Sequence, residues 1–298
     1  MRREVTLDDT TFPRAKSTRS GPFDRVARRR LACAPRLAVS PTLAIVRSRG
    51  SNNTAWLLGI ALATLVASLL PRRADAKESS GTADPMTLEV PGFADAYYFR
   101  PRTKSRRPIV LYLHGRGGNA LEDCRKWARV ARQFGWVVCP QGPASTDSGG
   151  RTWNNDAESA KRIIDATVIA LQSKYPGRVR SRGDVIIGFS EGAFIAQQVG
   201  VRDPAHWNRW LILAANDHYW LGDSPQLLEQ NRDKIRRVYL FTGEDDQVAE
   251  NTKRAGEMLK EAHIRVKVKI VPGLGHEVPA DRMITNYRRP LRWLLAAK

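Results

Sequence analysis

Short apolar segments alternate with amphipathic segments along residues 86–298, and this alternation restricts the chain to few folds. Strands alternating with helices are typical of a parallel sheet covered by helices on both faces. The pattern predicts one α/β domain over residues 77–298 that opens with two short antiparallel strands. Strands are expected at residues 86–90, 95–100, 108–114, 136–140, 184–189, 210–215, 238–242 and 266–271, and helices at residues 121–134, 157–174, 192–201, 251–262 and 281–295.

The first 76 residues lack this alternation and contain one uncharged apolar segment, AWLLGIALATLVASLL at residues 55–70. Its 16 residues fall short of the roughly 20 that a membrane-spanning helix needs, and they suit the apolar core of a signal peptide. Arg47 and Arg49 precede the segment, and Ala74-Asp75-Ala76 follows it as a cleavage motif. Residues 1–76 are thus predicted to be a basic extension that directs export, with cleavage near Ala76 and a secreted or periplasmic product.

Two observations keep a membrane anchor open as the alternative. More than fifty residues precede the apolar segment, whereas an ordinary signal peptide begins close to its apolar core. Arg72-Arg73 directly after the segment also suits a retained anchor, and residues 55–70 would then tether the domain to a membrane. A translation start nearer Val46 or Arg49 would explain the long upstream stretch.

Both parts of the chain are basic. The chain has 49 Lys and Arg against 30 Asp and Glu, a net charge of +19. Residues 1–76 contain 14 basic and 5 acidic residues, or +9, which leaves 35 minus 25, or +10, for residues 77–298. The 42% hydrophobic content excludes a largely disordered chain. The positive field favours acidic partners, anionic substrates or negatively charged surfaces.

Cys124 and Cys139 are the two cysteines that would remain after cleavage. Cys124 falls in the first turns of an expected helix and Cys139 ends an expected strand, so both are predicted at one edge of the sheet. An oxidising compartment would allow a disulfide, worth roughly 3 kcal/mol for a loop of about 15 residues. The alternative is two unpaired buried thiols. No CxxC motif or Cys/His cluster has the spacing of a zinc site, so no metal is expected.

The motif Gly-Phe-Ser-Glu-Gly at residues 188–192 is the clearest sign of chemistry. It follows the buried strand expected at residues 184–189 and opens the helix expected at residues 192–201. A serine on such a strand-to-helix turn has strained backbone geometry, and glycine on each side avoids collisions. Because a serine hydroxyl needs a base to take its proton, a histidine and an orienting carboxylate are expected later in the chain.

Both groups follow, in the order Ser, acid, His. The strand at residues 238–242 leads into the acidic turn Gly-Glu-Asp-Asp at residues 243–246, and the strand at residues 266–271 leads into Gly-Leu-Gly-His, ending at His276. With this order, residues 86–298 resemble the α/β-hydrolase superfamily. The resemblance is nearest to small lidless esterases of the phospholipase/carboxylesterase and dienelactone-hydrolase types, including secreted polyester-depolymerase relatives. It implies an α/β-hydrolase fold with a mostly parallel central sheet, helices on both faces and no large lid.

The resemblance also assigns catalytic residues. It implies Ser190 as the nucleophile, His276 as the base and Asp246 as the acid, because the family's acid stands three residues after the glycine of the turn. Asp245 is the near alternative, and Asp217, after the preceding strand, is a remoter one. A serine-hydrolase mechanism of this kind requires no metal or organic cofactor.

The sequence His-Gly-Arg-Gly-Gly at residues 114–118 follows the most hydrophobic strand, where the superfamily places its oxyanion loop. The resemblance implies an oxyanion hole made by the backbone N–H groups of Glu191 and of Arg116 or Gly117. His114 itself is expected to be structural.

Two residues are candidates for substrate binding. Trp153 resembles a pocket wall of the family, and His218 follows a strand at the edge where the pocket is expected; a packing role is the alternative for both. The connection between Ala215 and Arg236 is short, so a large lid is not expected.

The expected function is hydrolysis of small-molecule or polymeric carboxylic esters through a Ser-His-Asp triad and an acyl-enzyme intermediate. A serine peptidase or another acyl-transfer enzyme is the first alternative, since the triad does not fix the leaving group. The second is a non-catalytic module that binds nucleic acid or an acidic polymer through basic runs such as residues 178–182 and 288–289. No nucleic-acid motif accompanies these runs, so no nucleic-acid partner is expected.

We predict that the exported protein begins at Lys77, because signal peptidase cuts after a small-x-small motif. N-terminal sequencing and the intact mass of the protein recovered outside the cytoplasm should give residues 77–298. Substitution Ala76→Phe should leave residues 55–70 attached. Peptides from residues 1–45 in the mature product would contradict both the cleavage and the later translation start.

Overall fold

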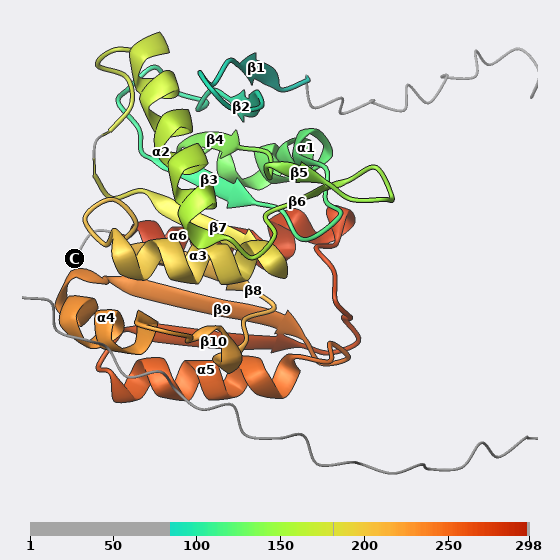
Figure 1. The fold of residues 1–298 in the computed structure, drawn as a ribbon, viewed down its shortest axis with the longest axis vertical. Helices are drawn as coiled ribbons and strands as arrows, with labels where there is room; N and C mark the ends of the chain where they lie inside the picture. The colour runs from blue at the N-terminus through green and yellow to red at the C-terminus, as the bar shows by residue number, and fades with distance from the viewer. Residues whose placement is uncertain (1–83, 181, 297–298) are drawn as a thin grey trace, which may run out of the picture. The chain divides into compact units, whose positions relative to one another are not determined.

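The structure is a computed structural model that describes residues 84–180 and 182–296, and an eight-stranded sheet forms its centre (Figure 1). The strand order is β1-β2-β4-β3-β7-β8-β9-β10; β1 with β2 and β2 with β4 pair antiparallel, and the later neighbours pair parallel. The strands are β1 (Met86–Leu88), β2 (Ala96–Phe99), β3 (Ile109–Leu113), β4 (Trp136–Cys139), β7 (Val185–Phe189), β8 (Arg209–Leu213), β9 (Arg237–Gly243) and β10 (Val266–Val271), with β5 (Ala144–Ser145) and β6 (Arg151–Thr152) in a separate hairpin. The α-helices are α1 (Ala120–Ala131), α2 (Ala157–Lys174), α3 (Glu191–Arg202), α4 (Ser224–Asn231), α5 (Ala249–Glu261) and α6 (Met283–Leu295), and the 3₁₀ turns are η1 (Asp217–Tyr219), η2 (Arg232–Lys234) and η3 (Ala280–Arg282).

Both faces of the parallel region are buried. On β3, Ile109, Leu111 and Leu113 belong to one apolar core, whereas Val110 and Tyr112 belong to the other. Helices α2, α3 and α5 contribute to the first core, and α1 and α6 to the second; in Figure 1, α2 and α3 lie in front of the sheet and α6 behind it. Burial on both faces explains why these strands read as continuous apolar runs. The arrangement confirms the predicted α/β architecture.

Parallel pairing sets the position of the motifs. Strands β3, β7, β8, β9 and β10 run in one direction, so their carboxyl ends share one edge of the sheet. Open α/β sheets bind ligands outside the carboxyl ends of their strands. The segments that carry residues 114–118, 190, 246 and 276 all leave the sheet at this edge.

Most elements lie where the sequence predicts them, and α2 and β10 occupy the predicted residues. The hairpin β5–β6 and helix α4 were not predicted from the sequence. Helix α4 has only 8 residues, and contacts with α3 hold it: the Gln198 side-chain amide donates to Ser224 Oγ at 3.3 Å. Such a helix depends on tertiary contacts and leaves little periodic pattern in the sequence.

The predicted disulfide is absent, and Cys124 and Cys139 are free buried thiols. The Cys124 thiol donates a hydrogen bond to the Tyr97 carbonyl on β2 at 3.4 Å. Cys139 lies opposite Tyr97 in the β2–β4 ladder, so the two cysteines do lie at the predicted edge. Burial raises the pKa of the Cys139 thiol well above its usual value. Each thiol packs as a small buried group, which is the alternative that the sequence left open.

The predicted N-terminal extension, residues 1–76 with the apolar segment 55–70, lies outside the described residues. Within residues 84–180 and 182–296, no helix combines the length and the apolar composition that crossing a membrane requires.

Asp184 is a buried carboxyl that links the start of β7 to the start of β3. It is fully buried directly before β7, and its Oδ1 accepts the N–H of Ile109, the first residue of β3, at 2.7 Å. Its Oδ2 is buried without a hydrogen-bond partner among the described residues. Burial raises the pKa of Asp184 to about 7, because the charged carboxylate loses its hydration there.

We predict that Asp184 makes the protein less stable as the pH rises from about 4 to about 7. The folded carboxyl keeps its proton across this window while the unfolded one loses it near pH 4. The folded state therefore binds more protons, and the free energy of unfolding falls as the pH rises. Asp184→Asn cannot titrate and still offers Ile109 an acceptor. Urea unfolding across the window should show the wild type losing up to roughly 4 kcal/mol relative to this variant.

Other titrating groups contribute equally to both proteins, so the difference between them isolates Asp184. A difference that stays constant from pH 4 to pH 8 would contradict a buried, protonated carboxyl.

Candidate active site

Ser190 stands on a tight turn between β7 and α3. Its backbone angles are φ 54° and ψ −118°, in a region that residues with side chains rarely occupy. A Cβ on Gly188 would collide with the Gly192 carbonyl, and a Cβ on Gly192 would collide with the carbonyls of Leu113 and His114. Glycine at both positions therefore lets the turn close and press against the end of β3.

Ser190, His276 and Asp246 form a hydrogen-bonded series. Nε2 of His276 lies 2.9 Å from Ser190 Oγ, and Nδ1 lies 2.9 Å from Asp246 Oδ2. The three residues follow β7, β10 and β9, whose carboxyl ends meet at this edge. In this arrangement the serine hydroxyl can donate to one ring nitrogen while the other ring nitrogen donates to the carboxylate.

Neighbouring groups hold the Asp246 carboxylate in place. Thr242 Oγ1 donates to Oδ2 at 2.8 Å, and the Val248 N–H donates to Oδ1 at 3.1 Å. Only 1% of the Asp246 side chain is exposed, against 36% for His276. The carboxylate is thus buried and oriented, while the imidazole reaches the surface where a substrate can approach.

The two alternative acids lie elsewhere. Asp245 is exposed to solvent. Asp217 accepts from Arg254 Nε at 2.7 Å and from the Asn251 side chain at 2.8 Å, and these partners hold the pKa of its carboxyl below the usual value despite the opposing effect of burial. Neither acid hydrogen-bonds to His276 within the described residues, which leaves Asp246 as its partner.

The loop after β3 lies directly against the Ser190 turn. A Cβ on Gly115 would lie 3.2 Å from Ser190 Cβ. Among the described residues, no group accepts the backbone N–H of Arg116 or of Glu191. The Gly117 N–H, by contrast, donates to the Arg151 carbonyl at 2.8 Å. Of the two predicted donors on this loop, Gly117 is therefore occupied and Arg116 is available.

Glu191 has a structural role that the sequence did not reveal. Its buried carboxylate accepts from the Thr152 hydroxyl at 2.8 and 2.9 Å, from the Trp153 N–H at 3.1 Å and from the Asn155 N–H at 3.2 Å. It also forms an ion pair with Arg116 at 2.8 Å, although 56% of the Arg116 side chain is exposed. One carboxylate thus joins the loop after β3, the loop after β6 and the start of α3.

Trp153 is not a pocket wall, which corrects the sequence prediction. Its side chain is fully buried, and its indole N–H donates to the His114 carbonyl at 2.9 Å. His114 is also buried; its Nε2 accepts the Gly142 N–H at 3.0 Å, and burial lowers its pKa. Both side chains thus connect loops from the core side. This agrees with the packing alternative for Trp153 and with the structural role expected for His114.

The 3₁₀ turn η1 contributes Tyr219 rather than His218 to the surroundings of Ser190. His218 is exposed, and the structure gives it no contact with Ser190. The Tyr219 hydroxyl donates to the Ser190 carbonyl at 3.4 Å, and its ring packs edge-on against Phe194 at 5.5 Å. The sequence offered only an aromatic pair at residues 219–220 as a signal, which did not separate Tyr219 from its neighbours.

Within residues 84–180 and 182–296, no three His, Cys, Asp or Glu side chains are arranged to hold a metal ion.

Comparison with known proteins gives matches by structure. No family model and no curated protein matches the chain. A Bacillus cereus ATCC 10987 protein described as uncharacterized is 23% identical with a TM-score of 0.54, over 66% of this chain and 62% of its own. Esterase PE8 is 23% identical with a TM-score of 0.51, over 70% of this chain and 100% of its own. A structure from a study of two fungal esterases from Rhizomucor miehei is 15% identical with a TM-score of 0.51, over 71% of this chain and 83% of its own.

The sheet order and these similarities decide the fold. The chain has the α/β-hydrolase fold. In an α/β-hydrolase fold, the serine turn stands at the carboxyl end of a central strand, with the acid and the histidine following later strands. Ser190, Asp246 and His276 occupy these places after β7, β9 and β10.

We predict that Glu191→Gln destabilises this α/β-hydrolase fold by about 2 kcal/mol, because it removes the charge that pairs with Arg116 and weakens bonds from three further donors. Chemical unfolding should show this loss. The matched control is Glu229→Gln, which breaks an exposed ion pair between Glu229 on α4 and Arg232 at the start of η2 and should cost at most about 0.5 kcal/mol. Equal losses in the two variants would contradict a central role for the Glu191 carboxylate.

Proposed function

We propose that the chain is a serine hydrolase that cleaves carboxylic esters through an acyl-enzyme intermediate. The observation that carries this proposal is the hydrogen-bonded series from Asp246 through His276 to Ser190, with both distances at 2.9 Å. The same fold in esterase PE8 and in the Rhizomucor miehei structure is consistent with it. The fold alone would not identify the reaction, since one fold supports many chemistries.

In the first half of the proposed cycle, Ser190 Oγ attacks the ester carbonyl carbon while His276 Nε2 takes the hydroxyl proton. Asp246 accepts the Nδ1–H of the ring and stabilises the imidazolium that forms. The carbonyl oxygen gains negative charge, and it would accept from the backbone N–H groups of Glu191 and Arg116, which have no acceptor among the described residues. Each such donor is typically worth about 100- to 1000-fold in rate.

The tetrahedral intermediate then collapses. The C–O bond to the alcohol breaks, His276 gives its proton to the leaving alkoxide, and an acyl group remains on Ser190. In the second half, water loses a proton to His276 and attacks the acyl carbon, which releases the acid and restores the serine. The protein groups suffice for this chemistry, and no metal or organic cofactor takes part in it.

The surroundings of the site favour accessible esters as substrates. The side chain of His276 is 36% exposed, and the segment between β8 and β9 packs through α4 against α3. A site left open in this way suits water-soluble or polymeric esters, whose size a closed pocket would exclude.

We predict that the full chain hydrolyses short-chain p-nitrophenyl esters and that Ser190→Ala lowers kcat at least about 10³-fold, because the nucleophile is lost. Ser173→Ala, on the exposed face of α2, is the matched control and should keep the wild-type rate. A fluorophosphonate probe should label the wild type and the control, but not Ser190→Ala.

Wild-type turnover by Ser190→Ala would overturn the proposal. Labelling of Ser190 without ester turnover would retain a serine nucleophile and favour the amide bond of a peptidase substrate over an ester.

A further inference from the structure

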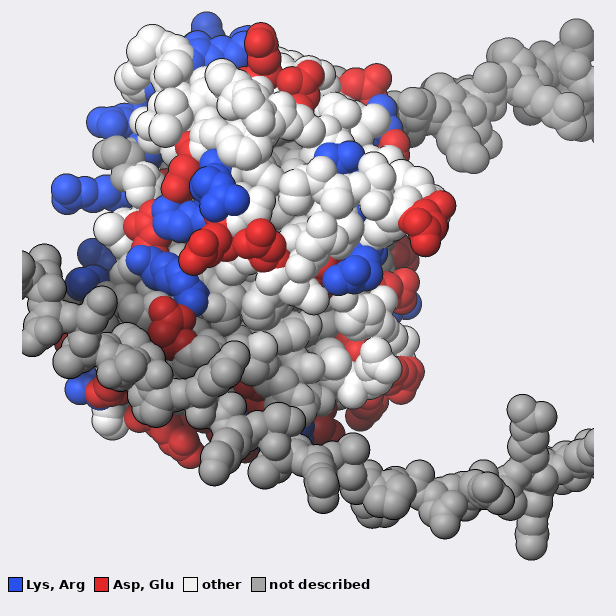
Figure 2. All heavy atoms as spheres, viewed as in Figure 1, with Lys and Arg blue, Asp and Glu red and all other residues white. Residues whose placement is uncertain are grey.

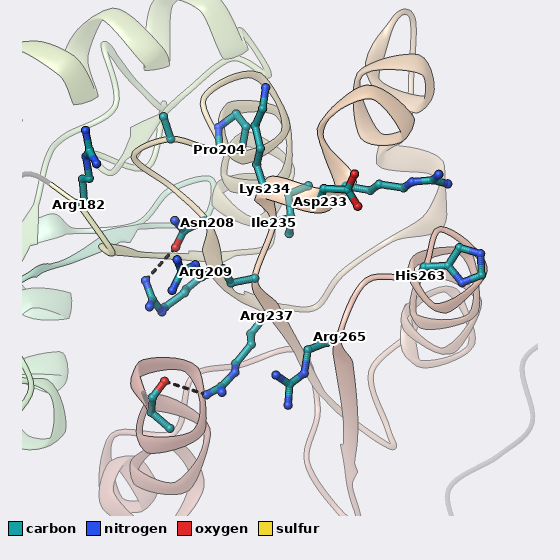
Figure 3. A pocket seen from close by; sticks show the side chains of 14 residues that line it. Arg182, Pro204, Asn208, Arg209, Asp233, Lys234, Ile235, Arg237, His263 and Arg265 are labelled. Atoms are coloured by element: carbon teal, nitrogen blue, oxygen red, sulfur yellow. Dashed lines mark hydrogen bonds between the residues drawn. The ribbon is translucent and has the colours of Figure 1, made fainter. Parts of the chain in front are cut away.

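Figure 3 shows a cavity of about 590 Å³. Its lining lies at the amino ends of the strands, the opposite edge of the sheet from Ser190. It opens where strands begin: Arg209 is the first residue of β8, Arg237 is the first residue of β9, and Arg265 directly precedes β10. Arg182, before β7, borders the same cavity. Since β9 has seven residues, at about 3.3 Å per residue, the cavity and the serine turn are separated by roughly 20 Å.

The lining of this cavity carries a large excess of positive charge. Among the described residues, the lining contains seven Lys or Arg residues and one carboxylate, Asp233. Side chains of Arg182, Arg236 and Arg265 form no hydrogen bond or ion pair with the described residues, and all three are exposed. Blue Lys and Arg side chains project from the left margin of Figure 2, the side where β9 and β10 begin in Figure 1.

Two of the arginines are held in place by uncharged groups. Arg209 Nε donates to the Leu294 carbonyl at 2.9 Å, and its Nη1 donates to Asn208 Oδ1 at 2.8 Å. Arg237 donates to the Ala296 carbonyl at 3.2 Å, and its guanidinium stacks over the Trp293 ring at 5.4 Å. These contacts orient the guanidinium groups, so little side-chain freedom remains to be lost when an anion binds.

Like charges oppose one another within this cluster. Burial first, and then the charges of Arg236 and Arg237, lower the pKa of Arg209. Burial and the charges of Arg265 and Arg236 do the same for Arg237. An anion placed among these groups would relieve the repulsion, which is a gain that a solvated surface charge does not offer.

The positive charge continues beyond the cavity along the same edge. Arg178 and Arg180 precede β7, and Arg107 precedes β3 and bridges to Val179. With strands about 4.8 Å apart, the five parallel strands from β3 to β10 spread these arginines over roughly 20 Å. An extended ligand with repeated negative charges matches a row of this length better than a single small anion.

We propose that this arginine row is a binding site for a flexible, linear phosphate polymer of the inorganic polyphosphate class. Guanidinium forks match phosphate oxygens in pairs, and arginine outnumbers lysine in the cavity lining. None of the described residues that line the cavity is a Phe, Tyr or Trp on which a nucleic-acid base could stack. The exposed large apolar residues of the described chain, Phe93, Ile169, Leu221 and Ile284, lie outside the lining and so provide no apolar anchor for a membrane there.

The site would hold the polymer while the serine turn faces the other way. Bound polymer at the amino ends of the strands leaves the carboxyl ends open, so docking and ester hydrolysis can proceed together. The inference goes beyond the proposed function and does not depend on it, because none of the cavity residues belongs to the hydrolytic site.

The test is isothermal titration of the full chain with short-chain inorganic polyphosphate. Arg182→Glu/Arg265→Glu should weaken binding at least about tenfold, since it reverses two exposed charges at the cavity. It should also reduce the slope of log Kd against log salt by about 0.7 for each lost contact. The matched control, Arg288→Glu/Arg289→Glu on the exposed face of α6, makes the same change in net charge and should bind as the wild type does.

Ester turnover, the Ser190→Ala variant and two further ligands separate the outcomes. Arg182→Glu/Arg265→Glu should keep the wild-type ester rate, and Ser190→Ala should keep the wild-type affinity for polyphosphate, so failure of one proposal is distinct from failure of the other. Equal weakening by the two double variants would overturn the site. Tighter binding of a single-stranded oligonucleotide or of anionic phospholipid vesicles at the same salt concentration would overturn the assigned ligand class.

Discussion

The arrangement of the candidate site depends on how closely the first turn of α3 approaches the end of β3. No side chain fits between Gly192 and the carbonyls of Leu113 and His114. This contact forces Ser190 into its positive-φ conformation and brings the loop after β3 to the side of the serine. Strain of this kind persists only where the surrounding structure over-determines it, and here the parallel strands on both sides of β7 supply that constraint.

Buried polar groups then transmit this constraint to the loops. Glu191, the residue after the serine, joins three loop segments through one carboxylate, while Trp153 and His114 tie the same loops from the core side. Asp246 is fixed in the same manner by Thr242 and Val248. A buried polar group without a partner lowers the free energy of unfolding. Each of these residues therefore favours the one arrangement of the loops in which it is hydrogen-bonded.

The sequence predicted the fold well because its elements have local signals, and the structure joins the three residues proposed from those signals, Ser190, Asp246 and His276, by hydrogen bonds. Buried parallel strands are continuous apolar runs, and the serine turn requires glycine at fixed positions. The sequence did not show that His218 is exposed, that Trp153 is buried or that the two thiols are free. Each of these outcomes depends on how the loops pack against one another. A tryptophan or a cysteine looks the same in the sequence whether its side chain lines a pocket or packs in the core.

The two edges of the sheet differ in charge, and this difference gives the molecule a polarity along the strands. Arginines gather where the strands begin, whereas the acids Glu191 and Asp217, where the strands end, are paired with Arg116 and Arg254. A body with charge separated in this way experiences a torque near any negatively charged surface, in addition to attraction. It turns so that the arginine edge arrives first, and the serine turn then faces the surrounding solution before any specific contact has formed.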